Sequence, residues 1–174
     1  MNKKNHQFIK KIATLSILLA AGIVLNIVDA IIPMPFGFRL GLANVVGLFV
    51  LYVFGFKEAI ILSLLRIVIA NLLRGLEFNT FMMALTGGII SMTIMWGLKK
   101  ITPFGIVVIS TIGAIFHSAG QLLVAMWLLA SSEVMTMLPI MLLTAIPTGI
   151  LIGIIADRII KVYQGNKKID INNL

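Results

Sequence analysis

The sequence predicts an all-α integral membrane bundle of six transmembrane helices with both termini in the cytoplasm. The chain of 174 residues is 60% hydrophobic and 11% charged, whereas soluble domains average about half apolar and a quarter charged residues. Most of its Lys and Arg residues lie in the gaps between apolar stretches, and gaps rich in these residues alternate with gaps that contain few of them. Because positively charged loops stay on the cytoplasmic side, this alternation predicts the direction in which each helix crosses.

The six helices are expected where about 20 residues, at 1.5 Å each, can cross the hydrocarbon core. The first follows a basic start and lacks a small-residue cleavage site, so it is interpreted as a retained helix and not a signal peptide. The second is short, because a Pro-rich loop precedes it and Gly55 follows it. Small residues at close spacing in the fourth and sixth, such as Gly149-x-x-x-Gly153, predict close helix packing. The predicted helices are residues 9–31, 40–55, 57–74, 79–98, 103–130 and 136–161.

Three segments follow from this assignment. Residues 1–8 form a cytoplasmic N-terminus, 9–161 the transmembrane domain and 162–174 a solvated cytoplasmic tail. Eleven Lys and Arg residues fall on the predicted cytoplasmic side and only Arg39 and Arg74 on the external side. The protein is therefore expected to be a multi-pass protein of the cell membrane.

Composition also excludes several classes of function. Orientation and anionic lipid head groups account for the net charge of +8, so no nucleic-acid partner is expected. The absence of cysteine excludes disulfides, thiolate metal sites and Cys nucleophiles. The sequence also lacks a P-loop, a His-Glu-x-x-His pattern and the Asp-rich motif that holds Mg²⁺ and diphosphate. We therefore expect no cofactor, no metal site and no independent enzymatic activity.

Polar residues within the apolar stretches are concentrated in the predicted external half. Such groups are costly at membrane depth and line cavities or pair with one another. The cytoplasmic halves are Leu, Ile, Val, Met and Ala, which predicts a pocket open to the outside and argues against a continuous channel. The candidate substrate-binding residues are Arg39, Asn44, Arg66, Asn71, His117 and Gln121.

Arg66 is the sharpest of these signals. An Arg near the middle of a spanning helix needs an internal carboxylate or an anionic ligand, and its guanidinium suits phosphate or carboxylate. Asp29 is one possible internal partner, and pairing of Asp29 with Arg39, Arg66 or Arg74 is an alternative to ligand contact. His117 has the alternative interpretation of a hydrogen-bonded core residue.

Two further alternatives remain open for the pocket. Asn44 and Asn71 have the alternative role of capping or bridging helices, which is the commoner use of amides in membranes. Apolar walls for the pocket are available from large side chains, although the same residues at helical spacing also suit core or lipid-facing positions. These side chains are Phe81, Met82, Met83, Phe116 and Trp127.

Several short motifs resemble one family. They are the Arg39-Leu40-Gly41-Leu42-Ala43-Asn44 stretch, Arg66, Thr86-Gly87-Gly88, and Gly113-Ala114-x-x-His117-Ser118-x-Gly120-Gln121. Together they resemble the Gx transporter family, also labelled heptaprenyl diphosphate synthase component I. This family is similar to the substrate-binding S components of energy-coupling factor (ECF) transporters. The resemblance covers about residues 10 to 160.

The S-component resemblance implies a six-helix bundle with a pocket that opens outward. It also implies that small residues of the first helix dock onto a transmembrane coupling subunit, which two ATPases drive. Ser16, Ala20 and Ala21 occupy the corresponding positions, although Ile17 departs from the small-residue pattern. Ordinary helix packing is the alternative explanation for these small residues. The synthase label implies instead a subunit of a prenyl-diphosphate enzyme.

Two functions from different classes therefore remain. The first is a substrate-binding membrane subunit of an energy-coupled uptake transporter, which captures a small, partly apolar, anionic molecule from outside. The second is a non-catalytic membrane subunit of a prenyl-diphosphate or quinone pathway, or of a membrane redox complex. The side of the membrane that carries the ligand site distinguishes them, because an anchor for a soluble enzyme would need an interface among the basic cytoplasmic loops.

Overall fold

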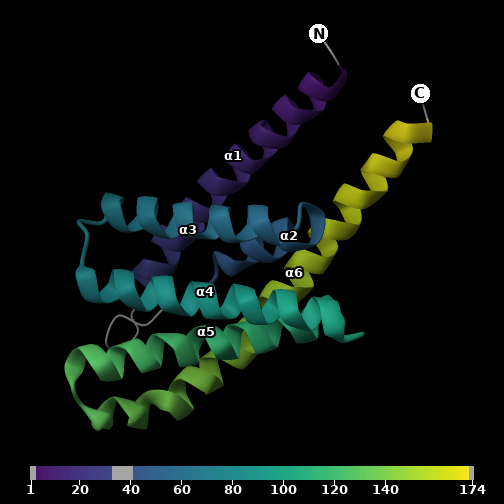
Figure 1. The fold of residues 1–174 in the computed structure, drawn as a ribbon. Helices are drawn as coiled ribbons and strands as arrows, with labels where there is room; N and C mark the ends of the chain where they lie inside the picture. The colour runs from purple at the N-terminus through teal and green to yellow at the C-terminus, as the bar shows by residue number, and fades with distance from the viewer. Residues whose placement is uncertain (1–2, 33–40, 173–174) are drawn as a thin grey trace.

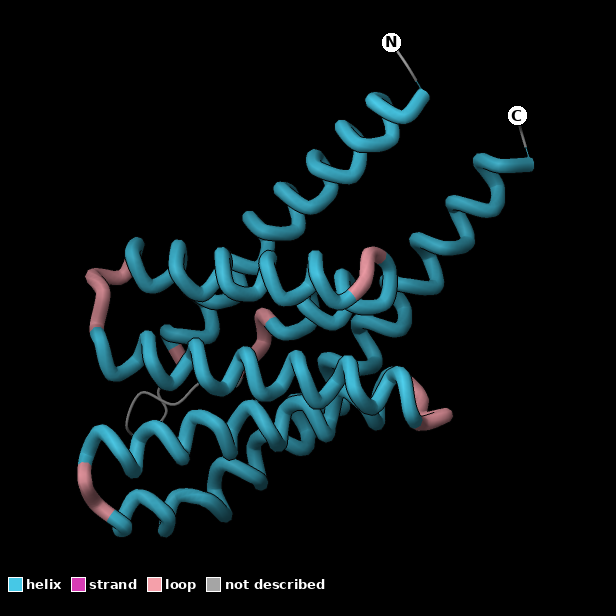
Figure 2. Tube along the Cα trace, in the orientation of Figure 1, coloured by secondary structure: helices cyan, strands magenta, loops and turns pink. Residues whose placement is uncertain are grey.

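The computed structural model describes residues 3–32 and 41–172, and these segments contain helices and turns but no strand (Figures 1 and 2). The predicted all-α fold class is confirmed for this part of the chain. Its elements are α1 (Lys3–Ile31), α2 (Asn44–Val53), α3 (Phe56–Leu73), α4 (Phe78–Ile101), α5 (Ile106–Leu129), the 3-10 helix η2 (Ser132–Met137) and α6 (Leu138–Asn172).

Four segments of the described chain are long and apolar enough to cross a membrane. They are Lys4–Ile31, Phe78–Ile101, Ile106–Leu129 and Glu133–Gly165. The helix α2 is apolar but has 10 residues, which span about 15 Å, or half of a hydrocarbon core. The structure thus supports a membrane-embedded bundle with four spanning helices, while crossing by α2 and α3 stays a prediction.

The observed helix boundaries differ from the expected ones mainly at the chain ends. The first helix begins at Lys3, not at residue 9, and α6 continues to Asn172, not to residue 161. The reason is that Lys and Gln are good helix formers in water, although they do not suit the hydrocarbon core of a membrane. The apolar length of a segment therefore gives the spanning part of a helix and underestimates the whole helix.

Close helix packing is strongest among α4, α5 and α6. A Cβ atom added at Gly149 would lie 2.7 Å from the Cα of Thr111, and one added at Gly153 would lie 2.6 Å from the Cα of Val107. Glycine thus lets α6 contact the backbone of α5, where lipid provides no hydrophobic drive for helix association. This observation confirms the packing prediction made for the Gly149-x-x-x-Gly153 pattern.

The short helix α2 is enclosed by other helices. It packs against α1, α3, α4 and α6, and Leu48, Val50 and Leu51 are completely buried. An apolar helix that is buried all round needs no polar face. The surrounding core also includes Met92 and Met95 of α4. This apolar cluster fills the interior beside α2, as the sequence predicts for the cytoplasmic half.

The two chain ends extend from the same end of the bundle (Figure 1). The α2–α3 and α4–α5 turns lie toward this end, and the α3–α4 and α5–η2 turns lie at the other (Figures 1 and 2). Lys11 forms a 2.5 Å ion pair with Glu58, and Lys99 donates a 2.9 Å hydrogen bond to the carbonyl of Leu51. We call this the basic end; its cytoplasmic orientation stays a prediction.

Candidate functional site

A cluster of buried polar side chains lies in the half of the bundle remote from the basic end. Four helices contribute to it: α1 near its C-terminus, α2 at its N-terminus, and α3 and α5 near their middle. The members that line a common cavity, here called the polar cluster, are Asn26, Asp29, Asn44, Arg66 and His117. Their side chains are at most 9% exposed. Burial of several ionisable and amide groups in an apolar helical bundle makes this cluster the candidate functional site.

Helix periodicity explains how these residues converge. Asn26 and Asp29 are three positions apart, so they share one face of α1 and project toward the bundle. Asn44 is the first residue of α2, immediately after the buried turn of Gly41 and Ala43. Because α1 and α2 run in opposite directions along neighbouring axes, the end of one meets the start of the other.

The cavity that these residues line is very small. Its volume is about 10 Å³, and Gly41, Ala43, Ile67 and Ala84 complete its walls. A cavity of that size holds about one water molecule. The polar cluster therefore has no room for a larger molecule in this conformation, and such a molecule would bind only after the surrounding helices rearrange.

Arg66 lies at the centre of the cluster and is 3% exposed. Its Nη2 donates to the side-chain oxygen of Asn44 at 3.4 Å, which is a long hydrogen bond. Its buried Nε has no hydrogen-bond partner among the described residues. Asp29 interacts electrostatically with this guanidinium and with that of Arg74. The guanidinium is thus partly neutralised and retains donor capacity.

The packing around Arg66 requires glycine on the neighbouring helix. A Cβ atom added at Gly22 of α1 would lie 3.0 Å from the Cδ of Arg66. That distance is shorter than an ordinary carbon contact of about 3.5–4.0 Å. Gly22 therefore makes room for the Arg66 side chain, which the sequence analysis did not anticipate.

Asp29 forms a hydrogen bond with the turn that precedes α2. Its Oδ2 accepts a 2.8 Å hydrogen bond from the backbone N–H of Gly41. Gly41 has φ of +80°, which glycine adopts without the steric cost that a Cβ imposes. A Cβ there would also lie 2.8 Å from the Nδ2 of Asn44. Charge and backbone geometry together fix this turn beside the cavity.

His117 and Gln121 lie one turn apart on the buried face of α5. A Cβ atom added at Gly87 of α4 would lie 2.8 Å from the backbone oxygen of His117 and 3.1 Å from the Cγ of Gln121. His117 lines the cavity, whereas Gln121 is 1% exposed and lies outside its lining. The predicted shared face is confirmed, and its contact with α4 depends on Gly87 of the Thr86-Gly87-Gly88 motif.

The structure gives Asn71 a local role. Its Nδ2 donates to the carbonyl of Ile67 at 2.7 Å, and its Oδ1 accepts a 3.0 Å hydrogen bond from Arg74. Both bonds lie within the C-terminal turns of α3, and Asn71 does not line the cavity. The amide thus bonds within its own helix and at its end, a local role that differs from the bridging of two helices. Arg39 lies outside the described residues.

None of the five side chains expected as apolar walls lines the small cavity. Met83 is buried, but Phe116 is 40% exposed and Trp127 is 75% exposed. Neither aromatic residue lines the small cavity, so both face away from it. The contribution that sequence reasoning missed comes from Asn26 and Asp29 as lining residues. Their spacing of three on one helix was the available signal.

The candidate docking residues of α1 are accessible. Ser16, Ala20 and Ala21 are exposed, and Ser16 lines an apolar groove of about 240 Å³ between α1 and α3. Ile17 is 70% exposed on the same helix. No group of three His, Asp or Glu side chains suited to a metal ion occurs in the described part of the chain.

Fold and site together define a membrane-embedded helical bundle with a buried polar cluster in one half. A family model for heptaprenyl diphosphate synthase component I matches residues 18–159, and the chain belongs to this family. The matched region contains all described members of the polar cluster. No curated protein and no solved structure matches the chain.

Proposed function

We propose that this protein is the substrate-binding membrane subunit of an energy-coupled uptake transporter. Its substrate is a small, partly apolar, anionic molecule taken from the external side. The observation that carries the proposal is Arg66, a buried cation with an unsatisfied Nε beside a cavity lined by polar groups from four helices. An Arg that is buried at membrane depth with remaining donor capacity suits a carboxylate or phosphate ligand.

The closed cavity supports a carrier better than a pore. It has room for about one water, and the apolar cluster around α2 fills the interior on the side of the basic end. A static channel would need polar groups through the whole thickness. Substrate entry and release therefore require rearrangement of the bundle, as in carriers that alternate between two accessible states.

The rearrangement needs an energy source outside this chain, because the sequence contains no nucleotide-binding motif. We propose a transmembrane coupling subunit with ATPases that docks on the exposed face of α1. The accessible small residues Ser16, Ala20 and Ala21 support this placement. Small side chains let two helix backbones approach closely within a bilayer.

A native mass spectrum of the purified protein would identify a co-purifying small molecule. Arg66→Ala should then abolish its binding while the protein remains folded and monodisperse. The loss should exceed about 2 kcal/mol, the scale of a desolvated hydrogen bond to a charged group. The double variant Arg66→Met with Asp29→Leu removes both charges at once. If the double variant binds the molecule as the wild type does, Arg66 serves Asp29 alone and the ligand role is disproved.

A second function is favoured by the description of the family. A non-catalytic membrane subunit of a prenyl-diphosphate or quinone pathway, or of a redox complex, would hold a lipid-like molecule or anchor a soluble enzyme. Exposed lysines at the basic end, including Lys57 and Lys100, offer such an enzyme an electrostatic interface. Co-purification distinguishes the two functions: ATPases with a membrane subunit support the carrier, and a soluble prenyltransferase supports the anchor.

A further inference from the structure

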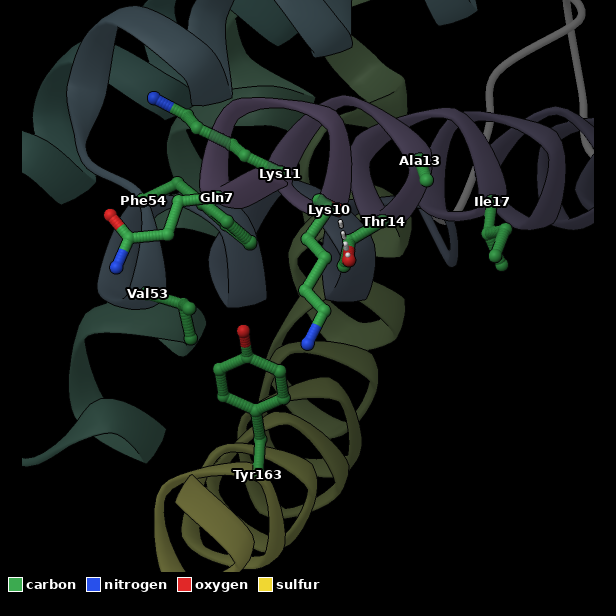
Figure 3. A pocket seen from close by; sticks show the side chains of 9 residues that line it. All are labelled: Gln7, Lys10, Lys11, Ala13, Thr14, Ile17, Val53, Phe54 and Tyr163. Carbon is green, nitrogen blue, oxygen red and sulfur yellow. Dashed lines mark hydrogen bonds between the residues drawn. The ribbon is translucent and has the colours of Figure 1, made fainter. Parts of the chain in front are cut away.

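A groove of about 700 Å³ lies at the basic end, between the N-terminal part of α1, the end of α2 and the Tyr163 region of α6 (Figure 3). Its volume is in the range of sites for small molecules, about 300–1,000 Å³. The groove is separate from the polar cluster. Along α1, its Ala13 is about 20 Å from Asn26 at 1.5 Å per residue.

One wall of the groove is polar. Figure 3 shows the Lys10 ammonium and the Tyr163 hydroxyl pointing toward the same space, and Gln7 lines the groove farther to the side. Lys11 points away in this view, which agrees with its 2.5 Å ion pair with Glu58. Lys10 forms no ion pair within the described segments. It is therefore the cation of this groove that is available to an anion.

The Tyr163 ring has a fixed position. It packs edge-on against Phe49 with ring centres 5.5 Å apart, and it contacts Phe54 at 6.5 Å. These contacts orient the phenol, whose hydroxyl has a hydrogen to donate. An ammonium and a held hydroxyl facing one space are suited to the oxygens of a phosphate group.

Apart from Thr14, the remaining walls are apolar and follow α1 toward the expected interior of the membrane. Ala13 and Ile17 continue the helix beyond Lys10, and Val53 and Phe54 line the groove from α2. Ile17 lies about 10 Å farther along the helix axis than Lys10. Lys10 itself stands where the basic start of the chain gives way to the apolar run, which is the level of lipid head groups.

We propose that this groove is a second binding site, specific for a phosphate-bearing amphiphile. The phosphate or diphosphate group of this amphiphile lies against Lys10 and Tyr163. The apolar chain of the same molecule runs along Ala13 and Ile17 into the bilayer. Two sources share this chemistry, namely a prenyl diphosphate and the head group of an anionic phospholipid. Basic recesses between transmembrane helices recognise such groups by the same combination of charge and apolar surface.

The test uses the full-length protein in phosphatidylcholine nanodiscs, with labelled farnesyl diphosphate as the probe. Lys10→Gln should lower the affinity about tenfold, the effect of losing one charged hydrogen bond. Ala13→Glu places a negative charge in the groove and should abolish binding. Lys57→Gln removes the same charge at the same end from an exposed residue outside the groove, and the affinity should stay within about twofold.

Competition separates the sources. Inorganic diphosphate and farnesol should each displace the probe at least about tenfold less well than unlabelled farnesyl diphosphate, because each lacks half of the recognised structure. Displacement by phosphatidylglycerol added to the nanodisc supports the site and identifies bulk anionic lipid as its occupant. No displacement supports the site and identifies the prenyl diphosphate. Equal losses in Lys10→Gln and Lys57→Gln, or equal competition by inorganic diphosphate, would overturn the proposal.

Discussion

Asp29 near the end of α1 accepts a 2.8 Å hydrogen bond from the backbone N–H of Gly41, just before α2. The two residues are twelve positions apart, and their bond ties the end of one helix to the start of the next. Since Gly41 also lines the small cavity, the same carboxylate holds a wall of the site and attracts Arg66.

This relationship predicts different outcomes for two substitutions of Asp29. Asp29→Asn keeps an oxygen acceptor for Gly41 and loses the charge, whereas Asp29→Leu loses both. The Leu variant should be less stable than the Asn variant by about 1–3 kcal/mol, because it leaves a buried N–H unsatisfied. Thermal unfolding in detergent measures the difference. Equal stability of the two variants would show that the hydrogen bond contributes nothing.

Gly22 provides a way to displace Arg66 without removing its charge. Gly22→Val adds a branched side chain at a position where even a Cβ atom would lie only 3.0 Å from the Arg66 Cδ. The Arg66 side chain must therefore shift. The affinity for the co-purified ligand should fall at least about tenfold, since charged hydrogen bonds depend on geometry.

Gly97 of α4 supplies the matched control, because a Cβ added there has no neighbouring atom within 4 Å. Gly97→Val should leave the ligand affinity unchanged. An unchanged affinity in Gly22→Val as well would mean that the position of Arg66 does not determine binding.

The contact of α4 with α5 should be sensitive to side-chain size at Gly87. Gly87→Leu inserts a side chain where a Cβ would lie 2.8 Å from the backbone oxygen of His117. Overpacking of this kind costs about 1–3 kcal/mol, so the unfolding temperature should fall clearly. Gly97→Leu on the same helix is the control. Comparable unfolding temperatures for both variants would argue against a tight α4–α5 contact.

The sequence predicts the helical class and the order of the helices because apolar length and charge position are properties of local segments. It also predicts that Arg66, His117 and Asn44 converge, since each is a costly polar residue in an apolar stretch. The local hydrogen bonds of Asn71 were beyond this reasoning. An amide that bonds to the carbonyl four residues earlier has the same sequence pattern as one that points into a cavity.

The shape of the site could not be predicted for a related reason. Gly22 and Gly41 matter because a side chain at either position would collide with atoms of other helices. Such contacts leave no signal in the local sequence. The volume of about 10 Å³ likewise depends on how four helices close around the cluster. Sequence reasoning therefore identified the polar residues but not the closed state of the cavity.

The orientation of the bundle is open to a direct test, because the chain contains no cysteine. Single cysteines can be placed at two exposed positions at opposite ends of the bundle, namely 57 at the start of α3 and 133 in η2. By the positive-inside rule, a membrane-impermeant thiol reagent should label position 133 in intact cells, and position 57 only after permeabilisation. Labelling of position 57 from outside would reverse the proposed orientation.

The docking proposal predicts that Ala20→Leu blocks assembly. The added bulk lies on an exposed helix face where a partner helix would approach closely, so co-purification of the coupling subunit and uptake should both fall. The ligand affinity of the isolated subunit should stay within about threefold, because Ala20 is exposed on the face of α1 that points away from Gly22 and Arg66. Ala30→Leu on the same helix is the control. An intact complex with Ala20→Leu would exclude this face of α1 as the docking surface.

The brevity of α2 bears on how the chain reaches its final structure during synthesis. A 10-residue helix of about 15 Å cannot span the bilayer alone, and its backbone ends would lack partners in hydrocarbon. Gly55, with φ of +108°, turns the chain directly from α2 into α3. We therefore expect the translocation machinery to receive α2 and α3 as one hairpin, and α2 to become stable only when α4 and α6 arrive to enclose it.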